Sequence, residues 1–216
     1  MKGGTAERRV EIGRDRRNRS IQKLLESAAR VVADRGSARA TIDDFIAAAG
    51  LSRGTFYNHF QTREALLDAL WAHLGHAPFV EIQRACAQIE DPALRLVTEA
   101  RLVVQKSAEN PTWGWLVLAA SSEGETVNPE LLSFPRPDLA IGQRAGRFTF
   151  DNLEVAGDLV VLGVRQAMRM ALTGQASPNY AGAICVMLLR SLGISEEQAR
   201  GLVATPLPCL PNPGRA

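Results

Sequence analysis

The sequence predicts an all-α protein, and three observations support this. Apolar residues recur three and four positions apart through most of the chain, which is the spacing of one face of an α-helix. Strict apolar–polar alternation, the pattern of a half-buried strand, never persists. With 46% apolar and 22% charged residues among 216, the chain can build a substantial core and is not disordered in bulk.

The first predicted helix follows a basic arm. Residues 1–19 hold seven basic and three acidic residues and almost nothing apolar, so we expect this arm to be disordered. Ser20 then caps a helix that Gly36 ends, because glycine readily takes the left-handed conformation. The apolar face of this helix consists of Ile21, Leu24, Leu25, Ala28, Val31 and Val32.

Two short helices are predicted next, with a sharp turn between them. Thr41 caps the first of the two, and Asp44, three residues on, completes a short variant of the capping box. Gly50 ends that helix, and Ser52 caps a very short helix that reaches about Phe60. Two helices joined by about three residues have the form of a helix-turn-helix.

The very short helix exposes polar side chains. Phe56 and Phe60 lie four residues apart and are predicted to face the core. A helix this short whose outer face can form many hydrogen bonds is typical of one that enters the DNA major groove by its N-terminus. The outward residues are Arg53, Gly54, Thr55, Tyr57, Asn58 and His59.

Each outward side chain suits a particular part of DNA. The two prongs of Arg53 fit guanine O6 and N7, while Thr55 and Asn58 can contact base edges or a thymine methyl group. Tyr57 and His59 are better placed for phosphates. Gly54 completes this set by allowing close approach of the backbone.

Three further residues belong to the predicted DNA-binding set. The hydroxyl of Thr41, with the amides of its helix N-terminus, suits a phosphate. Ser52 lies at the N-terminus of the very short helix that is predicted to enter the major groove. Arg63, the first residue of the next helix, is expected to contact a DNA phosphate through its charge. Thr62 caps that next helix, whose apolar stripe contains Leu66, Leu67, Leu70 and Leu74.

The charge distribution agrees with a polyanion at the N-terminal end. Residues 1–63 hold 13 Lys/Arg against 7 Asp/Glu, a net charge of +6, while the remainder holds 12 against 16, a net of −4. Within the arm, Arg14, Arg16, Arg17 and Arg19 suit the DNA backbone or the minor groove. A solubilising tail with no DNA contact is the alternative.

Over roughly residues 20–67 the sequence resembles the tetracycline-repressor (TetR) family of bacterial regulators. Four positions differ from the common family pattern without removing a DNA-facing group: Phe45-Ile46 replaces Ile-Ala, Leu51 replaces valine and Arg63 replaces lysine. Ile46 stands for a small residue at a close helix contact, where overpacking costs ~1–3 kcal/mol unless compensated. The matching residues are Thr41, Ala49, Gly50, Ser52, Gly54, Thr55, Tyr57, His59, Phe60, Glu64 and Leu67.

The resemblance implies a domain organisation and a mode of action. It implies a three-helix helix-turn-helix DNA-binding domain at residues 20–66 and a helical ligand-binding and dimerisation domain at 67–204, followed by a loose tail at 205–216. Proteins of this family are homodimers that usually repress, and a small molecule in the C-terminal domain releases the operator. A palindromic double-stranded operator is therefore expected.

The C-terminal part is predicted to contain the dimer interface. Residues 156–172 and 180–192 form two helical segments more apolar than burial on one side requires, so residues 156–193 are expected to pack against a second copy. The alternative is a core pair inside a monomer. Helices are predicted at 92–109, with Pro92 at the favoured first position, and at 112–122, 129–145, 155–174 and 178–193. Residues 123–129 and the Pro135/Pro137 pair are expected to form loops. The small residues expected to allow close approach are Ala156, Gly163, Ala167, Gly182 and Ala183.

An effector pocket is predicted among the large apolar residues of this part. The candidates are Trp113, Trp115, Phe134, Phe148 and Met168, each of which could equally be ordinary core. Because no cluster of charges indicates an ionic ligand, we expect a neutral or weakly polar organic effector and no cofactor.

Several other classes of protein are disfavoured. Cys86, Cys185 and Cys209 lie too far apart for a disulfide framework or a zinc motif, and His73 and His76 lack a completing carboxylate. No catalytic motif, signal peptide or membrane span is recognisable, so a cytoplasmic protein that is not an enzyme is expected. The resemblance to the TetR family implies in addition that the protein is bacterial and associates with the nucleoid when bound to DNA.

Two alternatives to a ligand-released repressor remain open. One is an activator or ligand-independent regulator on the same fold. The other is a helical small-molecule-binding protein or enzyme whose N-terminal domain no longer reads DNA.

Overall fold

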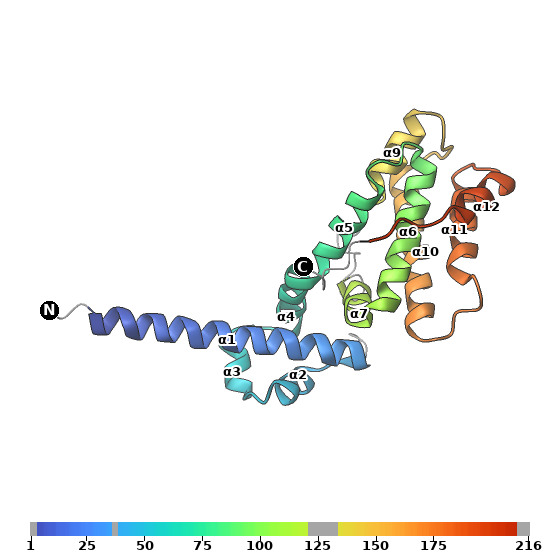
Figure 1. Cartoon of the computed structure of the whole chain (residues 1–216). Helices are drawn as coiled ribbons and strands as arrows, with labels where there is room; N and C mark the ends of the chain where they lie inside the picture. Colours follow the sequence, from blue (N-terminus) through green and yellow to red (C-terminus); the bar gives the residue numbers. More distant parts are fainter. Residues whose placement is uncertain (1–3, 36–38, 121–133, 211–216) are drawn as a thin grey trace.

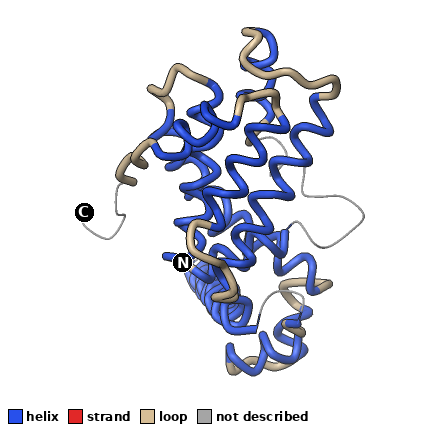
Figure 2. Tube along the Cα trace, turned by 90° about the vertical axis from the view of Figure 1, so that its right-hand side faces the viewer, coloured by secondary structure: helices blue, strands red, loops and turns tan. Residues whose placement is uncertain are grey.

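The computed structural model describes residues 4–35, 39–120 and 134–210, and every regular element within these ranges is helical, which confirms the all-α prediction. Figure 1 shows two parts: a head, residues 4–70, and a body, residues 71–210. The long helices of the body run side by side in Figure 2.

The head is held together by the apolar face of its first helix. Leu24, Ala28 and Val32 of that helix are fully buried, and Phe45 and Phe56 pack into the same core. Thr62 accepts a hydrogen bond from the amide of Ala65, as predicted for a cap, and Leu66, Leu67 and Leu70 are buried. The head helices are α1 (Gly4–Arg35), α2 (Ile42–Ala49), α3 (Arg53–Tyr57) and α4 (Arg63–Leu70).

Helix α1 begins at Gly4, so the expected disordered arm of residues 1–19 is helical from that residue onward. Once a helix is nucleated, each added residue contributes a hydrogen bond without a new nucleation cost, and no proline stands before Ser20. The first half of α1 extends away from the rest of the molecule in Figure 1. Gly36, the expected stop, lies outside the described residues.

A π-helical turn joins head and body. Helix α4 runs directly into η2 (Trp71–Gly75) and then α5 (His76–Cys86), so Pro78 stands within a continuous helical run, just beyond a locally widened turn. Gly75 permits a close contact in this turn, because a Cβ atom there would lie 2.4 Å from Cε3 of the Trp71 ring. Leu74 is exposed, whereas the other members of its predicted stripe are buried.

Helix α6 is the central element of the body and contacts α5, α7, α9, α10, α11 and α12. Asp91 caps it through the amide of Ala93, and Pro92 occupies the first turn, as predicted. The body helices are α6 (Pro92–Glu109), α7 (Pro111–Ala120), α9 (Arg136–Arg144), α10 (Leu153–Leu172), α11 (Tyr180–Ser191) and α12 (Glu196–Ala204).

The end of the chain differs from the expectation of a loose tail. Ser195 caps α12, a helix that the sequence analysis missed, by accepting a hydrogen bond from the amide of Gln198. Beyond it, Leu207 and Leu210 pack against the core, and Arg101 Nη1 donates to the carbonyl oxygen of Thr205 over 2.7 Å. Residues 211–216 lie outside the described part.

Helix α9 is shorter than the predicted helix 129–145. It starts at Arg136, and Pro137 stands in its first turn, where the missing amide hydrogen costs little. The Pro135/Pro137 pair, expected to form a loop, therefore opens a helix. Residues 129–133, and the expected loop at 123–129, lie outside the described residues.

Candidate nucleic-acid interface and effector pocket

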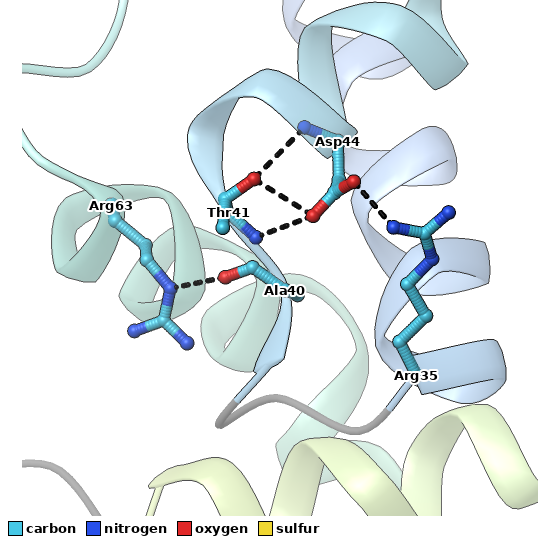
Figure 3. A network of polar contacts seen from close by, with 5 residues as sticks. All are labelled: Arg35, Ala40, Thr41, Asp44 and Arg63. Atoms are coloured by element: carbon cyan, nitrogen blue, oxygen red, sulfur yellow. Dashed lines mark hydrogen bonds and ion pairs between the residues drawn. The ribbon is translucent and has the colours of Figure 1, made fainter.

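The N-terminus of α2 carries a complete capping box (Figure 3). Thr41 Oγ1 accepts from the amide of Asp44 over 3.2 Å, and the Thr41 amide donates to Asp44 Oδ2 over 2.9 Å. The Thr41 hydroxyl also donates to Asp44 Oδ2 over 2.7 Å, and Arg35 pairs with the other carboxylate oxygen. Hydrogen bonds from Thr41 lower the pKa of Asp44. A phosphate at Thr41 would therefore have to replace Asp44 as the partner of the hydroxyl.

Arg63 links the start of α4 to the residue before α2. Its Nε donates to the carbonyl oxygen of Ala40 over 2.7 Å, and its side chain is only 18% exposed (Figure 3). Arg63, predicted to contact DNA, thus also has a structural role, because its guanidinium fixes the segment that precedes Thr41.

The turn before α3 is built as predicted. Gly50 is left-handed, with φ 60° and ψ 41°, and Leu51 packs half-buried against the head core. Ser52 Oγ accepts from the amide of Thr55 over 3.2 Å and lies 3.0 Å from Thr55 Oγ1. These local contacts set the direction of α3 relative to α2.

Helix α3 ends at Tyr57, with Asn58 as its C-cap, rather than near Phe60, but the inward and outward residues of this segment separate as the sequence predicts. Phe56 is completely buried and Phe60 is 9% exposed, whereas Tyr57 is 53% exposed. The remaining outward residues are exposed or half-buried: Arg53, Gly54 and Asn58 are exposed, and Thr55 and His59 are half-buried.

Arg53 is paired with an acidic residue that the sequence analysis missed. Its Nε donates to Asp43 Oδ1 over 2.9 Å and its Nη2 to Asp43 Oδ2 over 2.6 Å, and both side chains are exposed. The hydrogen bond from Arg53 lowers the pKa of Asp43. The two prongs predicted to read guanine are therefore occupied by a carboxylate of α2. The sequence did contain a signal for this ion pair, because Asp43 and Arg53 have opposite charges and lie ten residues apart, on either side of a tight turn.

Ile46 is half-buried and packs against the core of the head. The residue that replaces a small side chain is thus at a packed position, and the overpacking expected there stays a prediction.

A cavity of about 80 Å³, partly open to solvent, lies in the body and is bounded by α5, α6, α7, α10 and the residues just before α9. Of the five predicted pocket residues, Phe134 and Met168 line it. The rings of Phe134 and Phe79 stack with centroids 4.3 Å apart. The full lining is Phe79, Ile82, Gln83, Leu96, Glu99, Ala100, Val103, Val117, Phe134, Pro135, Val160, Val161, Val164, Arg165 and Met168.

The other three predicted pocket residues have different surroundings. Trp113 is buried, and its Nε1 donates to the carbonyl oxygen of Gly75 over 2.9 Å. Trp115 is half-buried against the larger core, and Phe148 packs tightly on Gly142 in a second core. These three are core residues outside the cavity lining.

Three polar residues of the cavity were not foreseen: Gln83, Glu99 and Arg165. Burial raises the pKa of Glu99 to about 7, with a further contribution from the charge of Asp138. Burial also lowers the pKa of Arg165. The sequence did contain a signal for the buried position of Glu99, because this residue shares the apolar face of α6 with Leu96 and Val103, which are buried.

Large apolar side chains are exposed on α10 and α11. Val155, Leu159 and Leu162 of α10 are 62%, 44% and 56% exposed, and Met187 of α11 is 61% exposed. Spacings of four and three residues place the α10 side chains on one face.

The small residues expected at the dimer interface mostly face this chain's own helices. Ala156, Ala167 and Gly182 are buried, and Gly163 lies against Leu188, so the close approach is between α10 and α11 of one chain. Ala183 alone among the five named residues is exposed.

The head and its exposed α3 define a helix-turn-helix protein of the DNA-reading class. A family model for bacterial regulatory proteins of the tetR family matches residues 24–70, and one for the tetracyclin repressor-like C-terminal domain matches residues 91–205. The chain belongs to the tetR family, a family of transcription regulators.

No helix of the described residues is long and apolar enough to cross a membrane.

Curated relatives match part of the chain. Rv1255c of Mycobacterium tuberculosis, an HTH-type transcriptional regulator, is 31% identical over 104 residues, which is 48% of each chain. YvdT of Bacillus subtilis, also an HTH-type regulator, is 36% identical over 53 residues, 24% of this chain and 27% of that one. The matched region thus spans about half, or less, of the length of these relatives.

Solved structures agree over most of the chain. RolR without ligand is 25% identical, covers 88% of this chain and all of its own, and has a TM-score of 0.67. A gamma-butyrolactone receptor is 16% identical with a TM-score of 0.58, covering 88% of this chain and 96% of its own. The second likeness concerns the fold alone.

Proposed function

We propose that this protein is a homodimeric repressor that binds a palindromic DNA operator and is released from it by a small organic effector. The observation that carries the proposal is the outer face of α3, where Arg53, Tyr57 and Asn58 stand exposed on a helix that Phe56 anchors. Exposed donors on a short helix of this kind suit the major groove. Such a regulator works in the bacterial cytoplasm, on nucleoid DNA.

The body supports the two other parts of the proposal. The exposed apolar side chains of α10 and α11 suit a second copy, and a twofold dimer presents two α3 helices to the halves of a palindrome. The internal cavity suits an effector. Structures of the same fold hold small organic ligands, resorcinol in RolR and stearoyl-CoA in FadR of Bacillus subtilis.

The test is DNA affinity measured by fluorescence anisotropy, on an operator selected from random duplexes and on the promoter beside the gene. Alanine at Arg53, Tyr57 and His59 together should lower affinity for the selected operator by at least a hundredfold. The change removes the expected base contact of Arg53, worth about 1–3 kcal/mol, together with the two expected phosphate contacts of Tyr57 and His59. The control carries alanine at Arg144 and Arg200, exposed arginines of the body. Equal affinity of the triple variant and the wild-type protein would show that α3 does not read DNA.

The direction of regulation needs a separate measurement. A reporter gene behind the adjacent promoter should be more active in a strain lacking the protein. Lower activity in that strain would instead identify an activator on the same fold.

A further inference from the structure

We propose that the effector is a small, uncharged aromatic compound with a hydroxyl group, and that the carboxylate of Glu99 accepts the hydrogen bond of that hydroxyl. This inference rests on the proposed function, in which the cavity of the body takes the effector. It adds the chemical class of the ligand and the residue that selects it.

The walls of the cavity fit a single flat ring. Twelve of the fifteen lining residues are apolar, and the stacked rings of Phe79 and Phe134 form part of the wall. The volume of about 80 Å³ is smaller than a cavity of about 150 Å³ that holds benzene, so one ring fits only with a modest adjustment. Met168, a flexible wall residue, can provide that adjustment. A long acyl chain would require much more space.

The polar groups of the cavity favour a neutral ligand. Glu99 of α6 and Arg165 of α10 have opposite charges, and Gln83 of α5 can both donate and accept. An anionic ligand would add negative charge beside Glu99 and near Asp138 in an environment that already disfavours it. A hydroxyl group instead gives Glu99 a charge-assisted hydrogen bond, which is among the stronger kinds in proteins.

The charged neighbours of Glu99 make this recognition depend on pH. Burial and the charge of Asp138 on α9 raise its pKa to about 7, and Arg95 on α6 opposes them. Both Nε and Nη2 of Arg95 lie 2.6 Å from Asp138 Oδ1, so this cation is already engaged. Cys86 of α5 also interacts electrostatically with Glu99, and Arg165 of α10 lines the same cavity. A hydroxyl donor binds the ionised carboxylate, so its affinity should rise between pH 6 and pH 8.

Four simple probes separate the possible chemistries: phenol, anisole, benzoate and benzene. Each has one aromatic ring. Phenol adds a hydrogen-bond donor, anisole adds only an acceptor, benzoate adds a negative charge, and benzene has no polar group. Titration of the full-length protein, followed by NMR at pH 6 and pH 8, should give phenol at least tenfold higher affinity than the others at pH 8. Phenol affinity should fall several-fold at pH 6, where phenol itself remains neutral.

Variants assign the effect to Glu99. Glu99→Gln should lower phenol affinity about tenfold at pH 8 and remove its pH dependence, because an amide acceptor is neutral. Glu109→Gln, the same change at an exposed position of α6, should leave both unchanged. The comparison of probes on the wild-type protein needs no variant and so does not depend on how the variants fold.

Several outcomes would overturn the proposal. Equal affinity for phenol and anisole would show that no donor is selected, and preference for benzoate, strengthening at low pH, would identify an anion site at Arg165. Absence of saturable binding of phenol would also reject it. These titrations contain no DNA, so they remain valid if operator binding fails, and their failure leaves the DNA measurements intact.

Discussion

The indole Nε1 of Trp113 donates a hydrogen bond over 2.9 Å to the carbonyl oxygen of Gly75, and so ties α7 to the π-helical turn between head and body. Helix α7 also contacts α1 of the head and contributes Val117 to the cavity. The Trp113 side chain therefore lies where the DNA-binding head joins the body that contains the cavity, and a regulator released by a ligand has to couple these two parts.

Trp113→Phe should lower the free energy of unfolding by about 2–3 kcal/mol. The substitution leaves a buried carbonyl without this donor and removes part of a tightly packed ring. Urea denaturation followed by circular dichroism measures the loss. Trp115→Phe on the same helix, at a half-buried position, should cost less. Equal losses in the two variants would argue that the bond to Gly75 contributes little.

Asp43→Asn should raise affinity for the operator several-fold. In the free protein, the carboxylate of Asp43 accepts both prongs of Arg53 and would also repel nearby phosphates. The change removes the competitor of DNA for this arginine. Anisotropy titrations at one fixed salt concentration measure the affinity, with Asp68→Asn, an exposed acid of α4, as control. A fall in affinity would mean that Asp43 holds Arg53 in its reading position.

Glu99→Gln should stabilise the protein at pH 8 and have little effect at pH 5. The pKa of Glu99 is raised in the folded state to about 7 from 4.5, so the folded state binds more protons than the unfolded state between these values. Stability of the wild-type protein therefore falls as pH rises through this window. The gain at pH 8 should be about 2 kcal/mol. Urea denaturation at both pH values checks the sign; a gain at pH 5 equal to that at pH 8 would contradict it.

Leu162→Glu combined with Met187→Glu should convert the proposed dimer to a monomer. Both side chains are more than half exposed in the single chain, so charges there should leave the protomer folded while opposing burial against a second copy. Sedimentation velocity measures the mass. The control is Arg84→Glu, on an exposed part of α5. A dimer that survives the double change would place the interface elsewhere.

Deletion of residues 1–18 should weaken operator binding and flatten its dependence on salt. Six basic residues lie within residues 1–18, on or before the first half of α1, and each phosphate contact that is lost reduces the slope of log affinity against log salt by about one. Affinity at two salt concentrations tests this. Identical values for the truncated and intact proteins would identify the segment as a solubilising extension.

The sequence by itself determined the helix-turn-helix of the head. The caps at Thr41, Ser52 and Thr62 and the left-handed Gly50 depend on hydrogen bonds and backbone angles within about four residues. The inward Phe56 follows from helical periodicity alone. All of these are local in the chain and were predicted correctly.

Tertiary structure alone decided the partners of Arg53, the surroundings of Glu99 and the role of Trp113. Asp43 pairs with Arg53, Trp113 donates a hydrogen bond to Gly75, and Glu99 lines a cavity with residues from four other segments. These contacts arise because helices from different parts of the sequence pack at particular angles and distances. An apolar pattern shows that a helix face is buried, but it does not show which side chain fills the core and which borders a cavity. Trp113 and Phe134, alike in sequence as large aromatic residues, were separated only by that packing.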